Sequence, residues 1–284
     1  MSRNNNDRLG QGPDHADPPI QEMTNKFDPL NFVAPTEFVE LPSRGLGYSE
    51  NHPLHKQETI EIKYMTAKDE DILTSQTLLK KGLAIERFLD NVILDKRIKA
   101  ADLFVGDRNA IIIAARVSGY GAEYETKVTC PACAEKSSLV FDLKNTTVTE
   151  TSLDSDLDIS MVEGGNFQTT VPFSKFKIVF RLLKGTDENY LAKLTSNKRK
   201  GKLNESLVSD QFKRMIVSIE GHSDREIVNR FVDNMPTLDS RHLRACYKMV
   251  NPNVRVIENY ACPSCGFEDG MEVPFGADFF WPDR

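Results

Sequence analysis

Two Cys-Pro-x-Cys pairs limit the folds open to this chain more than any other feature of its sequence. They are Cys130 with Cys133 and Cys262 with Cys265. Each pair would present two thiolates on one tight turn, and two such turns facing each other give the tetrahedral sulfur cage that zinc prefers. A closed shell of four sulfurs has no open coordination position, so we expect a structural zinc ion.

Two alternatives to a zinc site stay open on the sequence alone. The first is a redox-active Cys-x-x-Cys motif, which normally opens a helix, whereas the residues around both pairs favour strands. The second is two unrelated core pairs. Zinc is favoured because paired Cys-x-x-Cys motifs are a specific signal for a metal site. The fifth cysteine, Cys246, lies on an apolar helical stripe and is predicted to be a core residue.

The distribution of apolar residues favours a reducing compartment. Residues 1–28 are polar and have no apolar core of the signal-peptide type. No apolar run approaches the roughly 20 residues that span a bilayer. We therefore expect a chain that stays in the cytosol, where cysteines bind metals and seldom form disulfides.

The spacing of the two pairs predicts a mixed α/β (α+β) fold in which a zinc ribbon is split by an insertion. The two halves are expected over residues 123–145 and 252–284, each with strands around its cysteine turn. Between them, residues 146–251 are predicted to be a mainly helical insertion, apart from two short strands around Pro172. The ion would clamp both ends of the insertion and contribute on the order of 10 kcal/mol to folding.

Local patterns divide the insertion further. Residues 146–165 are acidic and rich in serine and threonine, which is typical of a linker or a mobile loop. Apolar residues repeat at helical spacing from Phe212 to Ile219 and predict one helical stripe. Ser223 followed by Glu226 fits the capping box of the next helix.

A small α+β domain is predicted over residues 37–122, after an extended or disordered arm over residues 1–36. Thr66 is expected to begin a helix, with Asp69 in its first turn completing a capping pattern. The segment from Ala110 to Ala115 is apolar all round, so its helix is expected to be buried at the centre of this domain.

Apolar residues near both ends of the chain are candidate docking positions for a partner. Those near the N-terminus would lie in a partner's groove or belong to a floppy terminus. Those near the C-terminus would pack back on the core or dock into another chain. The candidates are Phe27, Leu30, Phe32, Phe38, Phe279, Phe280 and Trp281.

Catalysis and bulk nucleic-acid binding are both disfavoured. The sequence has no phosphate-binding loop and no hydrolase or metalloprotease motif, and His52 and His55 lie in a turn-rich loop. A metal-dependent enzyme would need an open coordination position. The 36 basic and 42 acidic residues give a net charge of −6, whereas duplex DNA binders usually carry a basic surplus. The basic run at residues 197–202 keeps a zinc-ribbon nucleic-acid-binding accessory protein as the alternative function.

Several short motifs of the chain carry a resemblance to a known family. They are Glu40-Leu-Pro-Ser-Arg-Gly45, Gly106-Asp-Arg-Asn-Ala110, the two Cys-Pro-x-Cys turns and the closing Phe279-Phe-Trp-Pro282. Together they resemble the baseplate hub family of T-even-type contractile-tailed bacteriophages, which includes hub subunits and hub assembly chaperones.

This resemblance implies a structural or assembly protein of the tail baseplate, without enzymatic activity. Its expected partners are other baseplate or hub proteins. The net charge disfavours nucleic acid as a partner, and the lack of a long apolar run argues against a membrane. It would work in the cytoplasm of the infected bacterium during assembly, and a permanent subunit would stay in the virion tail.

Overall fold

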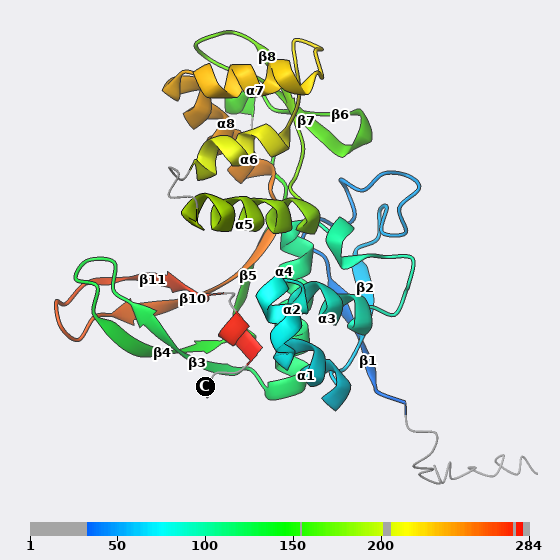
Figure 1. Ribbon diagram of the computed structural model, residues 1–284, viewed down its shortest axis with the longest axis vertical. Coiled ribbons are helices and arrows are strands. Elements are labelled where there is room, and N and C mark those ends of the chain that lie inside the picture. The colour runs from blue at the N-terminus through cyan, green and yellow to red at the C-terminus, as the bar shows by residue number, and fades with distance from the viewer. Residues whose placement is uncertain (1–32, 154, 201–205, 275–276, 281–284) are drawn as a thin grey trace, which may run out of the picture. The chain divides into compact units, whose positions relative to one another are not determined.

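The computed structural model describes residues 33–153, 155–200, 206–274 and 277–280 of the 284-residue chain. It has a mixed α/β fold with several small sheets and eight α-helices in the described part, so the mixed α/β part of the predicted fold class is confirmed (Figure 1). Residues 34–284 form one compact unit. No helix of the described residues is long and apolar enough to cross a membrane.

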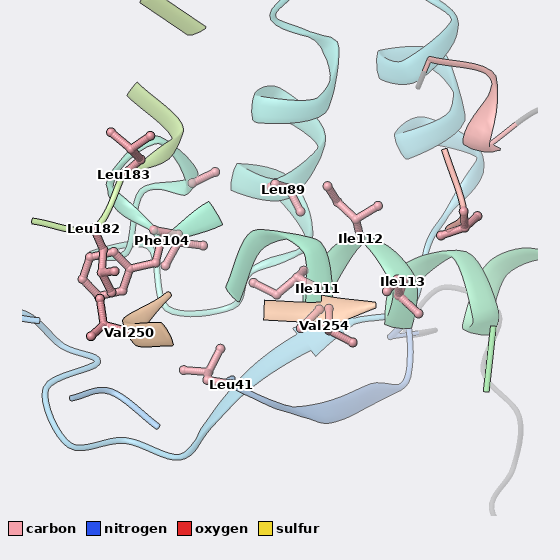
Figure 2. Close-up of a cluster of buried hydrophobic side chains, with 14 of the residues drawn as sticks. Leu41, Leu89, Phe104, Ile111, Ile112, Ile113, Leu182, Leu183, Val250 and Val254 are labelled. Atoms are coloured by element: carbon pink, nitrogen blue, oxygen red, sulfur yellow. The ribbon is translucent and has the colours of Figure 1, made fainter. Parts of the chain in front are cut away.

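A long helix, α4 (Val105–Tyr120), lies in the core of this unit. Ile111, Ile113 and Ala115 are buried, which confirms the prediction of a buried helix at this position. Helix α4 packs against helices on one side and strands on another, and Figure 2 shows Ile111 facing Val254 of a strand far along the chain. Apolar residues on all sides of a helix require such neighbours all round.

The segment before α4 forms a two-stranded sheet and three helices. Thr66 and Asp69 form the predicted capping box at the start of α1: the Thr66 N–H and hydroxyl both donate to the Asp69 carboxylate. The elements are β1 (Thr36–Glu40), antiparallel to β2 (Thr59–Lys63), then α1 (Ala67–Thr74), α2 (Gln76–Lys81) and α3 (Ala84–Val92).

Two β-hairpins carry the cysteine turns. The strands are β3 (Glu123–Thr129) with β4 (Lys136–Asp142), and β10 (Asn253–Ala261) with β11 (Glu268–Glu272). A further strand, β5 (Thr146–Thr149), pairs with the first part of β10. The predicted linker therefore begins as a strand, because its Thr-Thr-Val-Thr run is rich in β-branched residues and β10 offers it a free edge.

The region between the hairpins contains a four-stranded antiparallel sheet besides its helices. The strands are β6 (Ser160–Val162), β7 (Asn166–Thr170), β8 (Lys177–Phe180) and β9 (Ile216–Ile219). The helices are α5 (Gly185–Lys200), α6 (Leu207–Met215), α7 (Arg225–Asn234) and α8 (Thr237–Val250).

Two local predictions for this region are wrong. The apolar stripe from Phe212 to Ile219 is not one helix, because α6 ends at Met215 and the following Ile-Val-Ser-Ile run pairs with β8. The cap of α7 is Asp224, one residue after the predicted Ser223. Its carboxylate accepts hydrogen bonds from the backbone N–H groups of Glu226 and Ile227, the second and third residues of the helix.

Candidate metal centre

The four cysteines of the two pairs meet at the turns of the two hairpins. Their Sγ atoms all lie within 4.8 Å of one another. The Sγ atoms of Cys130 and Cys265 are 3.7 Å apart, and so are those of Cys133 and Cys262. Each short distance joins one hairpin to the other, across sequence separations of 135 and 129 residues. Among the described residues, this is the one group of three or more potential metal ligands.

The two turns use the same backbone hydrogen bonds. The N–H of Cys130 donates to the carbonyl of Glu135, and the N–H of Cys262 donates to the carbonyl of Phe267, both at 2.8 Å. In each case the first cysteine of the pair is therefore held at the end of its strand. The sequence repeat is thus also a repeat of local structure.

One position in each turn adopts left-handed backbone conformation. It is Ala134 in the first turn, with φ of 61°, and Gly266 in the second, with φ of 70°. The N–H of this residue donates to the carbonyl of Cys130 or Cys262, at 2.9 and 3.0 Å. The left-handed residue reverses the chain direction, which lets both sulfurs of a pair point to the same side. Glycine adopts the left-handed conformation with less steric strain than alanine.

The spacing of the sulfurs fits one four-coordinate ion. Zinc–sulfur bonds of about 2.3 Å place tetrahedral ligands about 3.8 Å apart. The two cross-hairpin distances of 3.7 Å match this edge, and they are far longer than the S–S bond of about 2.0 Å in a disulfide. None of the five cysteines forms a disulfide.

The site is half buried, and its electrostatics favour a thiolate at one cysteine and disfavour it at two others. Cys130 and Cys262 are buried, whereas Cys133 and Cys265 are exposed. Hydrogen bonds from the backbone N–H groups of Cys265 and Ser264 lower the pKa of Cys262 to about 6. This favours the thiolate at Cys262, the form in which cysteine binds metals. At Cys133 a hydrogen bond from the Glu135 N–H lowers the pKa, but the neighbouring thiols and burial outweigh it and raise this pKa to about 12.

Contacts between the hairpins bring the two turns together. Strand β4 of the first hairpin packs against β10 of the second. The Ser137 hydroxyl lies 2.9 Å from the Tyr260 hydroxyl, and the ring of Tyr260 is buried. The cysteines thus stand at the end of a packed strand pair and not on free loops.

The predicted docking residues fall into three groups. Phe38 is exposed on β1. Phe279 and Phe280 are buried: the Phe279 ring meets Tyr124 edge-on at 5.0 Å, and the Phe280 ring meets Phe88 at 5.1 Å. Of the two alternatives for these rings, packing back on the core is the one present. The others, Phe27, Leu30, Phe32 and Trp281, lie outside the described residues.

The remaining candidates are not part of the cysteine cluster. The His52 ring stacks on Tyr48, and its Nδ1 accepts from the Leu54 N–H; the Nδ1 of His55 bonds the Tyr48 carbonyl. Cys246 is buried, and its thiol donates to the Thr169 hydroxyl, which confirms its place in the core. The side chains of the basic run at 197–202 lie outside the described residues.

The Gly-Asp-Arg-Asn motif at the start of α4 has a role that sequence patterns did not indicate. A Cβ atom on Gly106 would lie 2.0 Å from the carbonyl oxygen of Pro252, so only glycine permits this contact. Asn109 Nδ2 donates to Oδ1 of Asn253 at 3.1 Å. Together these two residues hold the start of α4 against the start of β10.

The middle residues of the motif reach two other segments. The buried Asp107 carboxylate accepts from the Ser43 N–H and hydroxyl, and from the Tyr48 hydroxyl at 2.7 Å. Arg108 forms an ion pair with Glu188 of α5 at 2.6 Å. The residues that this motif contacts lie far away in the chain, so no local pattern could predict its role. Its one signal in the sequence was that it belongs to the motifs that carry the family resemblance.

A family model described as "T4 bacteriophage base plate protein" matches residues 38–281. The chain belongs to this family. The resemblance to the baseplate proteins of contractile tails is therefore confirmed at the level of the family, and this is a structural family of the phage particle. Searches of curated proteins and of solved structures give no match.

Proposed function

We propose that this baseplate protein acts through protein–protein contacts, either as a subunit of the baseplate hub or as a chaperone of hub assembly. The family match over residues 38–281 carries this proposal. Its partners would be other baseplate proteins, met in the cytoplasm of the infected bacterium. A hub subunit would remain in the virion, whereas a chaperone would leave.

The proposal includes one structural zinc ion held by Cys130, Cys133, Cys262 and Cys265. The fit of the sulfur spacing to a tetrahedral shell supports it. Zinc suits a site made of thiolates alone, because soft sulfur ligands select it over calcium or magnesium. With all four positions filled by protein, the ion would tie the hairpins together and would have no place for a substrate.

Phe38 and the strand that carries it are the part of the N-terminal docking region that lies among the described residues. Its ring is exposed. Within the described part of the chain, β1 pairs with β2 along one of its edges, and no strand pairs with its other edge. An exposed aromatic on a free strand edge is suited to strand addition by a partner. We propose that Phe27, Leu30 and Phe32 extend this contact.

Quantitative mass spectrometry of mature phage particles and of infected-cell lysate tests the proposal. A fixed stoichiometry with the other tail proteins in particles identifies a hub subunit. Abundance in tail intermediates and absence from particles identifies an assembly chaperone. Absence from both particles and intermediates would refute a role in the baseplate. Metal analysis of the purified chain, with zinc expected at one ion per chain, tests the cysteine site separately.

A further inference from the structure

The backbone hydrogen bonds between β1 and β2 determine which way each residue of β1 faces. At one end the Leu41 N–H donates to the Glu58 carbonyl, and at the other end the Tyr64 N–H donates to the Pro35 carbonyl, both at 2.8 Å. Hydrogen-bonded and non-hydrogen-bonded pairs alternate along an antiparallel ladder. The odd-numbered residues of β1 therefore bond to β2, which lies beside it (Figure 1).

The even-numbered residues of β1 present their backbone groups on the opposite edge. They are Thr36, Phe38 and Glu40, each with one N–H and one carbonyl. Within the described part of the chain, no strand pairs with this edge and no backbone hydrogen bond engages these groups. All three residues are exposed, and Phe38 is 70% exposed. An extended peptide is the ligand whose own backbone matches such a row of donors and acceptors.

Acidic side chains lie on and beside the two strands. Glu40 and Glu58 are exposed, and neither forms an ion pair with a described residue. Glu61 lies directly across from Phe38, and its carboxylate accepts from the Thr36 hydroxyl at 2.9 Å. Three carboxylates thus surround the position of Phe38.

The cations near these carboxylates are few and mostly engaged. Lys63 of β2 is paired with the buried Asp69 at 3.1 Å. The Lys96 ammonium donates to backbone carbonyls at the end of α3. Lys56, two residues before Glu58, is exposed, but one such cation does not balance three carboxylates. Negative charge therefore prevails along this edge.

A groove at the Glu40 end of β1 has the same charge. It has a volume of about 280 Å³, and its charged lining is Glu40, Glu58, Glu150 and Arg44. The Arg44 guanidinium is paired with Glu150 at 2.6 Å, which leaves two carboxylates over. Val148 gives the groove an apolar wall. A lysine or arginine suits such a groove, because its stem packs on apolar groups while its charged head meets carboxylates.

Two occupants from this chain itself fit the edge poorly. A second copy would place one acidic edge against another. Residues 1–32 contain three basic and five acidic residues, and prolines interrupt them at positions 13, 18, 19 and 29. Proline lacks the N–H that a paired strand needs. Both features favour a separate protein as the source of the added strand.

We propose that a neighbouring baseplate protein adds an extended strand to β1, with an apolar side chain beside Phe38 and a lysine or arginine beside Glu40. The proposal rests on the proposed function, which supplies the class of partner, and it adds the backbone positions and the charge that this partner matches. Main-chain hydrogen bonds supply affinity, and the acidic groove selects the basic side chain.

Photo-crosslinking identifies the added strand. A photoreactive phenylalanine analogue is placed at position 38 of the full-length chain, which is expressed during phage infection. We expect an adduct with a baseplate protein, at a segment in which an apolar residue stands two positions from a lysine or arginine, since alternate residues share one face of a strand. An adduct with a second copy of this chain or with residues 1–32 would overturn the proposal, and so would the absence of any adduct with a baseplate protein.

Two variants of Phe38 separate the backbone from the ring. Phe38→Ala removes the ring and keeps the N–H, whereas Phe38→Pro also removes the N–H, which faces away from β2. Phe38→Pro should therefore lower recovery of the baseplate protein with the tagged chain at least about tenfold more than Phe38→Ala does. Both variants should unfold near the wild-type temperature, because the ring is exposed and an edge strand tolerates proline at an outward N–H.

Charge reversal tests the acidic groove. The double variant Glu40→Lys and Glu58→Lys should lower recovery of the baseplate protein at least about tenfold. Its control is the double variant Glu125→Lys and Glu163→Lys, which changes the net charge equally at exposed positions elsewhere and should leave recovery unchanged. Equal losses in the two double variants would mean that the groove selects no basic side chain.

The two proposals fail in different ways. If Phe38→Pro and Phe38→Ala recover the baseplate protein equally, no strand is added at this edge, and the proposed function stands. If the wild-type chain recovers no baseplate protein from any tail intermediate, the proposed function is wrong as well.

Discussion

At the residue scale, substitution of Cys262 tests whether the cysteine cluster binds a metal, and substitution of the core residue Cys246 is its control. Cys262→Ser removes one of four sulfurs and should abolish tight zinc binding, lowering the free energy of unfolding by on the order of several kcal/mol. Cys246→Ser is the control, because it changes a buried thiol away from the cluster. Metal analysis and thermal unfolding measure both. Equal zinc content in the two variants would contradict the four-sulfur site.

The two cysteine turns also provide an internal comparison of backbone strain. Ala134 and Gly266 occupy the same place with φ of 61° and 70°. Ala134→Gly should raise the free energy of unfolding by about 0.5 kcal/mol, because it relieves the left-handed strain at some entropic cost. Gly266→Ala should lower it by about 1 kcal/mol for the opposite reason. Chemical denaturation measures both, and changes of the same sign would show that the turns are not equivalent.

At the scale of elements, Asp187 joins α5 to its neighbours through charge. Its buried carboxylate accepts paired hydrogen bonds from Arg181, next to β8, and from Arg214 of α6. Burial alone would raise the pKa of Asp187, but the hydrogen bonds from Arg181, the Lys184 N–H and Arg214 outweigh it and lower this pKa. The carboxylate therefore stabilises the fold in its ionised form.

Asp187→Asn should lower the free energy of unfolding at neutral pH by about 3 kcal/mol, because it leaves two arginines without their partner. Since the folded-state pKa is below the unfolded value of about 3.9, the wild-type contribution is present above that pH and is lost as the pH falls through the folded-state pKa. The variant should thus have a flatter acid dependence. Asp233→Asn, which breaks an exposed pair with Lys213, should cost less than about 1 kcal/mol.

The elements also show where sequence patterns are informative. The capping box at Thr66 and the buried helix around Ala110–Ala115 were predictable, because each depends on residues within a few positions. The change from helix to strand after Met215 was not predictable, because the apolar residues of Ile216–Ile219 fit both the helical period of 3.6 residues and the strand period of two. Pairing with β8 decides between them, and no local pattern contains that partner.

At the scale of the whole molecule, the candidate metal site was more predictable than the packing around it. Cysteine spacing identified four residues whose sulfurs meet across 129 or more positions. The contacts of Gly106 and Asn109 with residues 252–253 could not be predicted in the same way, because glycine and asparagine have many other uses. Paired cysteines indicate a contact between distant segments because few other roles need that spacing. A close steric fit such as that of Gly106 leaves no such pattern in the sequence.

Removal of the proposed zinc ion tests how far its effect extends through the molecule. The core around α4 is built from apolar side chains that do not depend on the ion, whereas the cysteine turns have few buried groups besides Cys130 and Cys262. A strong chelator should therefore speed amide hydrogen exchange at residues 130–135 and 262–267, and along the adjoining strands, while α4 stays protected. Added zinc should restore the protection, and magnesium should not, because it prefers oxygen ligands. Equal loss of protection in α4 would mean that the ion holds the entire unit together. No change at the cysteine turns would mean that they keep their structure without a metal.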